Sequence, residues 1–166
     1  MRAVLLVALL AGGCRYDLDH HEADASVSGR SCKVATVAVC QEADSHSDFT
    51  WIKDKIFAAN CFGASCHTGT TASGKLDLTD DPYLALMGTG AGVMSNLDPA
   101  HQRIVPGDPA NSYLFFILKG TEASSGTPAF AEPPANVGYM PMSNGTLCCQ
   151  KIDAIDRWIT AGAMAD

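Results

Sequence analysis

The stretch IFAANCFGASCHTG, from Ile56 to Gly69, holds two cysteines with four residues between them and a histidine directly after the second. Upstream of it, apolar residues recur with the spacing of one helix face, and Ser47 or Asp48 can cap the start of that helix. We therefore expect a helix from about Asp48 to Asn60. It leads directly into Cys61, the first cysteine of the motif.

Three more helices are expected downstream. TDDPYLALMG (79–88) offers caps, a proline for the first turn and a glycine stop, and NSYLFFILKG (111–120) begins with Asn111 as its cap. TLCCQKIDAIDRWITAGA (146–163) places its isoleucines on one face. Residues 121–138 are rich in Pro, Gly, Ser and Ala and predict a loop. Only KVATVAVC (33–40) is β-like, so the predicted class is all-α.

The composition indicates one domain, and it gives no sign of a basic surface that would bind nucleic acid. A chain of 166 residues is typical of a single core, here expected over residues 48–166. The net charge is -7, and the 11 Lys and Arg residues form no basic cluster. Acidity itself indicates solubility or, at most, a basic partner.

The N-terminus has the pattern of an export signal. MRAVLLVALLAGGC combines one basic residue, a short apolar run and small residues before Cys14. We interpret residues 1–13 as a lipoprotein-type signal peptide and Cys14 as the lipidated mature N-terminus. The alternative is ordinary cleavage, with Cys14 free or in a disulfide. Either way we expect an exported protein of a bacterial cell envelope, in the periplasm or on the outer surface.

Residues 14–47 are predicted to be a polar tether followed by a segment pinned to the domain by disulfides. Cysteines of exported proteins are normally bonded to something. Adjacent cysteines rarely bond each other, so Cys148 and Cys149 at the last helix favour two bridges to Cys32 and Cys40. The sequence leaves the pairing open, and a local Cys32–Cys40 bridge is the competing arrangement.

Cys61, Cys66 and His67 are candidate ligands of a cofactor. Structural zinc and iron–sulfur sites need four spaced ligands, and the only other close pair of cysteines is the adjacent one. A covalent haem uses two cysteine sulfurs and the histidine after the second, usually spaced C-x-x-C-H. The spacer here is two residues longer and contains Gly63. The competing interpretation is a Cys61–Cys66 disulfide beside an uninvolved His67.

A haem also needs a ligand on its far side. GYMPM, from Gly138 to Met142, places Met140 on a loop before the last helix, and thioether sulfur is a known axial ligand in cytochromes c. Met142 is the alternative methionine. His101 is the candidate for a site with two histidines. The remaining histidines, at 20, 21 and 46, are expected to be solvated.

In their order along the chain, these pieces resemble a class I cytochrome c domain. The similarity covers about residues 49–163, and more specifically the chain resembles the cytochrome-c-like modules frequent in exported planctomycete and myxobacterial proteins. It is carried by IFAANCFGASCHTG, GKLDLTDDPYLALMG, RIVPGDPANSYLFFILKG, and MPM followed by IDAIDRWITAGA. The family's usual MPP is MPM in this chain.

The resemblance implies crossing first and last helices, with short helices and long loops around one covalent haem c. Carried over by position, Cys61 and Cys66 match the attachment cysteines, His67 the proximal ligand and Met140 the distal ligand. The expected function is electron transfer between redox partner proteins by a lipid-anchored carrier that is not itself an enzyme. The alternative function is a haem-free binding or structural lipoprotein with a Cys61–Cys66 disulfide.

Overall fold

A computed structural model describes residues 32–63, 66–89, 92–142 and 145–166. The expected signal peptide, Cys14 and the first part of the tether lie outside these ranges. The described residues form helices and loops without a β-strand, and one isolated antiparallel bridge joins Met94 and Gln102. The all-α prediction is thus confirmed for this part of the chain. None of its helices has the length and apolarity that crossing a membrane requires.

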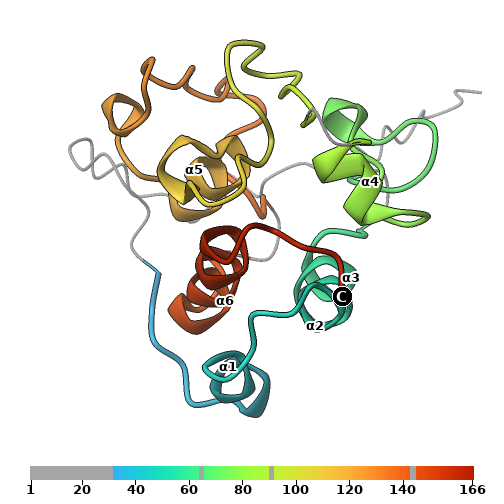
Figure 1. The fold of residues 1–166 in the computed structure, drawn as a ribbon, viewed down its shortest axis with the longest axis vertical. Helices are drawn as coiled ribbons and strands as arrows, with labels where there is room; N and C mark the ends of the chain where they lie inside the picture. Colours follow the sequence, from blue (N-terminus) through green and yellow to red (C-terminus); the bar gives the residue numbers. More distant parts are fainter. Residues whose placement is uncertain (1–31, 64–65, 90–91, 143–144) are drawn as a thin grey trace, which may run out of the picture.

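The described residues form six α-helices, whose arrangement is shown in Figure 1. Short 3₁₀ turns lie at Ser73–Lys75, Pro109–Asn111 and Ala123–Ser125. A π-helical turn, Lys53–Phe57, joins α2 to α3. The α-helices are α1 (Ala38–Ala43), α2 (Phe49–Ile52), α3 (Ala58–Asn60), α4 (Pro82–Met87), α5 (Tyr113–Lys119) and α6 (Cys149–Thr160).

Together α2, the π turn and α3 make one helix over the predicted range. The carboxylate of Asp48 accepts the N–H of Trp51 at 2.8 Å and caps the first turn, as predicted. A second carboxylate, Asp166 at the end of the chain, accepts the N–H groups of Phe49 and Thr50 at 3.1 and 2.6 Å. Both acidic groups satisfy amides that a helix start leaves without partners.

The expected helices α4 and α5 are present, with one difference at a cap. In α4, Asp81 accepts the N–H of Leu84 at 2.8 Å, and Gly88 follows the last turn. Asn111 does not cap α5, because Pro109–Asn111 forms its own 3₁₀ turn, capped by Asp108. Helix α5 begins two residues after Asn111 and ends at Lys119, and the Gly120 that follows has a left-handed backbone (φ 65°), which favours glycine.

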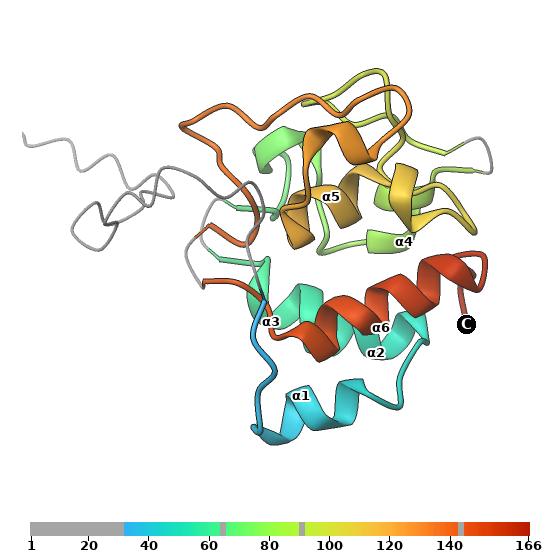
Figure 2. The same ribbon diagram turned by 90° about the vertical axis from the view of Figure 1, so that its left-hand side faces the viewer.

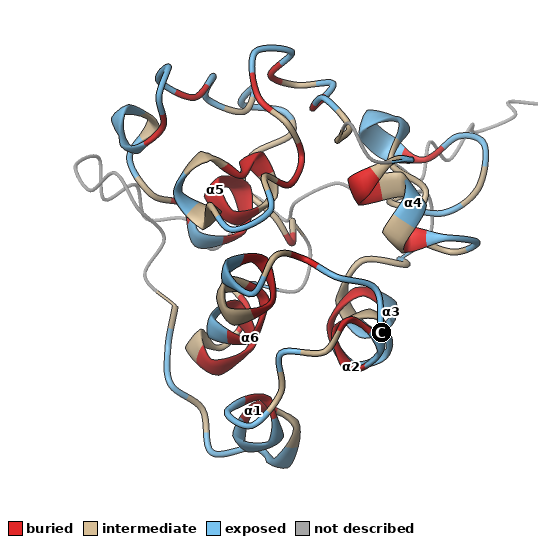
Figure 3. Ribbon diagram, in the orientation of Figure 1, coloured by how far each residue is buried: buried red, intermediate tan, exposed pale blue. Residues whose placement is uncertain are grey.

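Helix α6 lies at the centre of the fold, with α5 on one side and α1 on the other (Figures 1 and 2). Its predicted apolar face is buried, and buried residues gather on α2, α5 and α6, whereas half of α1 is exposed (Figure 3). Trp158 is 2% exposed, and its ring centroid lies 5.1 Å from that of Phe49. The first helix of the predicted domain and the last helix therefore pack against each other.

The N-terminal segment is fastened to α6 by two disulfides. Cys32 pairs with Cys149, and Cys40 pairs with Cys148, with Cα–Cα distances of 5.0 and 6.4 Å. This is the expected tie between the segment and the last helix, and a local Cys32–Cys40 bridge does not form. The guanidinium of Arg157 on α6 also donates to carbonyls of the segment at residues 43 and 46.

The β-like interpretation of residues 33–40 is wrong, because residues 33–37 form no strand and helix α1 begins at Ala38. Val37 keeps the extended backbone that its β-branched side chain favours. After Val37, Cys40 and Ala43 on one face of helix α1 are buried against α6. This burial outweighs the weak preference of the local sequence for a strand.

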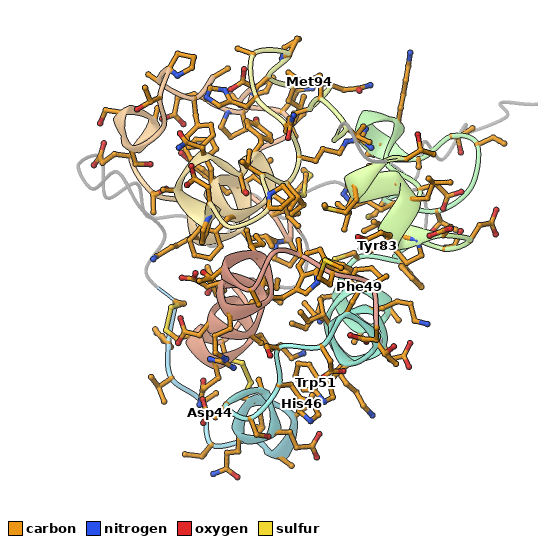
Figure 4. The ribbon with its side chains drawn as sticks, in the orientation of Figure 1. Asp44, His46, Phe49, Trp51, Tyr83 and Met94 are labelled. Atoms are coloured by element: carbon orange, nitrogen blue, oxygen red, sulfur yellow. A yellow bond between two sulfur atoms is a disulfide. The ribbon has the colours of Figure 1, made fainter. Side chains whose placement is uncertain are left out.

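His46 is half-buried rather than simply solvated. Its ring stacks on Trp51 at 4.7 Å, and its Nδ1 lies 2.6 Å from the carboxylate of Asp48 (Figure 4). The same view shows Phe49 beside Tyr83, with ring centroids 5.3 Å apart, which connects α2 to α4. These contacts fix the helix that leads into the cysteine motif.

Candidate functional site

Backbone hydrogen bonds connect the described residues of the cysteine motif, which follows α3. The N–H of Cys61 donates to Phe57 at 2.8 Å and so continues the helical pattern to the first cysteine. The N–H of His67 then donates back to the carbonyl of Cys61 at 3.2 Å, and that of Cys66 donates to Gly63 at 2.8 Å. These backbone hydrogen bonds position the two cysteines and the histidine relative to one another.

The imidazole of His67 is oriented by a backbone carbonyl. Its Nδ1 lies 3.1 Å from the oxygen of Leu76, and because a carbonyl only accepts, this nitrogen carries the hydrogen. In the neutral ring, Nε2 then holds the lone pair that a metal needs. Burial lowers the pKa of His67, although hydrogen bonds to the backbone of Leu76 and Ser73 oppose this effect. The site thus favours the neutral, ligating form.

A cavity of about 330 Å³ brings the motif together with the late methionines. Both cysteines, His67, Met140 and Met142 line it, although they come from segments more than 70 residues apart in the chain. The rest of its wall is mainly aliphatic and aromatic, as expected for a site that encloses an organic cofactor. The apolar lining residues are Ile56, Phe57, Leu76, Leu78, Leu86, Leu97, Leu114, Ile117, Leu118 and Val137.

The methionine loop is held against α5. The N–H of Met140 donates to the carbonyl of Ile117 at 3.0 Å. The neighbouring Tyr139 packs edge-on against Phe116 and donates its hydroxyl to Glu132 at 2.6 Å. Burial and the nearby Glu132 carboxylate raise the pKa of Tyr139, so its hydroxyl stays protonated and can keep donating. Both Met140 and Met142 line the cavity, so both remain candidates for the distal ligand.

His101 is placed away from this cavity. Its Nδ1 lies 2.7 Å from the carboxylate of Asp98, its Nε2 lies 2.9 Å from the carbonyl of Pro128, and it is not among the lining residues. Both nitrogens are therefore engaged in hydrogen bonds that hold the loop around Pro128. The structure does not bring this alternative distal ligand to the site.

The two cysteines of the motif take part in neither disulfide. Burial and, to a lesser extent, the nearby Cys66 raise the pKa of Cys61 to about 12, and Lys151 opposes the rise. Cys61 is thus a protonated thiol at neutral pH. In the described part of the chain, His, Cys, Asp and Glu side chains form no group of three or more that could hold a metal ion.

These residues fit a haem. The cavity has an apolar wall, two cysteine sulfurs, an imidazole whose tautomer is set for ligation, and a thioether from a different segment. Cys61 and Cys66 would hold the porphyrin, and His67 with Met140 or Met142 would hold the iron. No single segment of the chain carries this combination.

The sequence interpretation missed two buried cations. Arg103 lines the cavity, and Lys151 on α6 donates to the carbonyl of Lys55 at 2.9 Å. They are 8% and 7% exposed, respectively. A lysine among the polar positions of an amphipathic helix gives no signal of burial. Arg103 begins the segment RIVPGDP, where only its place next to an apolar pair sets it apart.

Comparisons with protein-family models, curated proteins and solved structures found no match for the chain.

Proposed function

We propose that this chain is an exported c-type cytochrome that carries electrons through one covalent haem. The observation that supports this most directly is the cavity, which joins a Cys-x4-Cys-His turn to a methionine loop across an apolar wall. The resemblance of the sequence to class I cytochrome c domains agrees with this assignment. Haem would supply the one-electron chemistry, since its iron alternates between two oxidation states.

In this proposal, the protein holds the cofactor and excludes water from it. Cys61 and Cys66 fix the porphyrin, and the hydrogen bond from His67 to Leu76 keeps the imidazole in one orientation. Met140 supplies a second permanent ligand, which favours electron transfer over reactions that need an open position on the iron. The aliphatic wall would keep the environment of the haem nearly the same in its oxidised and reduced states.

The decisive test is an absorption spectrum of the chain, oxidised and reduced, after expression with a haem-attachment system. Denatured protein that retains the haem mass would establish covalent attachment. The matched control is Cys61→Ser with Cys66→Ser, which should lose that mass. A wild-type chain without haem absorption, and with a mass two hydrogens below that expected with the Cys32–Cys149 and Cys40–Cys148 disulfides alone, would refute the proposal. It would instead support the alternative, a haem-free binding lipoprotein with a Cys61–Cys66 disulfide.

The distal ligand is tested by two single substitutions. If Met140 binds the iron, Met140→Leu should remove the long-wavelength charge-transfer band of Met–iron ligation and lower the reduction potential. Met142→Leu, the matched control from the same loop, should leave both unchanged. The reverse result would assign the ligand to Met142. If neither variant changes the band or the potential, a methionine ligand is excluded.

We also infer a lipid-anchored protein of the bacterial envelope that exchanges electrons with redox proteins. The two disulfides indicate an oxidising compartment, which agrees with export. Mass spectrometry of the mature chain from its membrane fraction tests the anchor: we expect a chain that starts at Cys14 and carries acyl groups. Cys14→Ser should release the protein into the soluble fraction, and an unmodified Cys14 would refute the anchor.

A further inference from the structure

His101 and Asp98 form the most buried ion pair in the described part of the chain. Their side chains are 3% and 5% exposed, whereas those of the other pairs are at least 35% exposed. The pair also joins two separate segments. His101 Nε2 lies 2.9 Å from the carbonyl oxygen of Pro128, and the Asp98 carboxylate accepts the N–H of Ala131 at 2.8 Å. Residues 98–101 thereby hold the segment 121–138 in place.

The geometry of this pair requires one hydrogen more than a neutral imidazole has. The carbonyl of Pro128 only accepts, so His101 Nε2 must donate to it. A carboxylate also only accepts, so the 2.7 Å contact between Nδ1 and Asp98 needs a second hydrogen. A neutral imidazole carries one hydrogen on its two nitrogens. The pair therefore holds two hydrogens, and the second lies between Nδ1 and the carboxylate oxygen.

Loss of one hydrogen would turn an attractive contact into a repulsive one. The hydrogen that remains goes to Asp98, because a hydrogen bond to a charged acceptor is the stronger of the two. Nε2 then directs a lone pair at the carbonyl oxygen of Pro128, so two acceptors face each other in a buried place. A buried acceptor that has lost its donor is unfavourable. The contact most weakened is the one that holds the segment 121–138.

Charged and titratable groups on the neighbouring elements are engaged elsewhere. Burial, and then the charges of Asp98 and Glu132, raise the pKa of Tyr113 on α5 to about 12, so this phenol stays neutral over a wide range of pH. Glu132 accepts the hydroxyl of Tyr139 at 2.6 Å. The guanidinium of Arg103 donates to the carbonyl of Ala85 at 2.6 Å. The hydrogen shared by His101 and Asp98 is therefore the one whose loss acts directly on the contact with Pro128.

The segment that the pair holds also forms part of the cavity wall. Asn136 and Val137, near its end, line the cavity. Phe130, next to the pair, has its ring 4.4 Å from the His101 ring and stacks at 4.5 Å on Phe116 of α5. A change at His101 can therefore reach one side of the cavity through a continuous stretch of chain.

We propose that His101 and Asp98 form a proton-dependent latch, which holds the segment 121–138 against the body of the protein and releases it as the pH rises. Histidine suits this role because it is the side chain that gains and loses a hydrogen near neutral pH. The latch would make the closure of one cavity wall depend on pH. The inference goes beyond the proposed function and stands without it, because none of these contacts involves a cofactor.

The test is NMR of the full chain as the pH is raised, with the iron kept reduced if haem is attached. At the low end of the range both ring nitrogens of His101 should carry hydrogen, and one should lose it in a single step. Through this step, amide exchange at Thr127 and Phe130 should accelerate about tenfold or more beyond the rise that base catalysis gives every amide. Leu114, whose N–H donates to Arg103 at 2.9 Å, should show only that ordinary rise.

His101→Gln and Asp98→Asn remove the hydrogen that titrates, so the step in exchange should disappear in both variants. His46→Gln is the matched control, because His46 forms the half-exposed pair with Asp48, and it should keep the step. The latch is wrong if His101 loses its hydrogen while exchange in the segment shows no step, or if the step persists in His101→Gln. Equal acceleration at Leu114 would mean that the whole chain loosens, and it would also overturn the latch. Should the variants fail to fold, the wild-type measurement alone decides.

Discussion

Removal of both disulfides is expected to destabilise the fold by more than the sum of the two single removals. The bridges span 117 and 108 residues and lie side by side, so their separations differ by only nine residues. In the chain-entropy treatment, closing a loop of either length stabilises the folded state by about 4.8 kcal/mol. With one bridge present, the other closes a loop of only about nine residues, and this is worth about 2.6 kcal/mol.

The structure therefore predicts about 2.6 kcal/mol for each single removal and about 7.4 kcal/mol for both, a coupling of about 2.2 kcal/mol. The double-mutant cycle uses three variants, which are Cys32→Ala with Cys149→Ala, Cys40→Ala with Cys148→Ala, and all four substitutions together. The packing energy lost with each sulfur contributes equally to both routes of the cycle, so it cancels from the coupling energy. The two bridges close nearly the same loop of the unfolded chain, and this is the origin of the coupling.

Guanidinium-induced unfolding, followed by tryptophan fluorescence and circular dichroism in the same haem state, gives the three free energies. A combined loss equal to the sum of the single losses within about 0.5 kcal/mol would refute the reasoning. Such additivity would mean that the two bridges constrain the unfolded chain independently. A single loss near 4.8 kcal/mol would contradict it as well.

Three further predictions concern single residues. The pKa of Cys61 is raised from 9.0 to about 12, so near neutral pH its alkylation in the folded, haem-free chain should be about a thousandfold slower than in the denatured chain. Alkylation should be slower still in Lys151→Met, because Lys151 opposes the rise in pKa. Equal alkylation rates in the folded and denatured chain would contradict this prediction. Asp48→Ala should cost about 1 kcal/mol at neutral pH. Since the folded state lowers the pKa of Asp48, this difference should shrink as the pH falls from the ordinary value of 3.8 through the lower pKa of the folded state. Asp153→Ala, exposed on α6, should show neither effect in pH-dependent unfolding. Ile155→Ala, at a side chain with 0% exposure, should cost about 2–5 kcal/mol in denaturant unfolding, and a cost below about 1 kcal/mol would contradict its place in the core.

Where the sequence has strong periodicity and caps, it predicted the helices well. The helix from Asp48 to Asn60 and helix α6 follow from apolar spacing, a capping residue and a stop signal, all of which act within a few residues. The π turn inside the first of these helices has no such signal. Helix α1 depends on contacts more than 100 residues away, through Cys40 and its partner Cys148, so local propensity alone indicated a strand.

The candidate site was predicted in part. The motif at 61–67 and the methionine loop were found by spacing and order, and the structure places both on one cavity. His101 was a reasonable candidate from residue type alone, but Asp98 and Pro128 occupy its two nitrogens. Arg103 was missed because burial of a cation is a property of the assembled fold. Its neutral partners come from residues 74, 75, 85 and 96, which no sequence pattern connects to it.

The layout of the cysteines also sets an order of events during biogenesis. Cys61 and Cys66 are five residues apart, whereas the structural bridges join residues separated by 108 and 117. In a newly exported, unfolded chain, short loops close much faster than long ones. Oxidation would therefore capture the motif cysteines first. If these cysteines carry haem, the cell must keep them reduced until the cofactor is attached, and only then allow the two long-range bridges to lock the N-terminal segment onto α6.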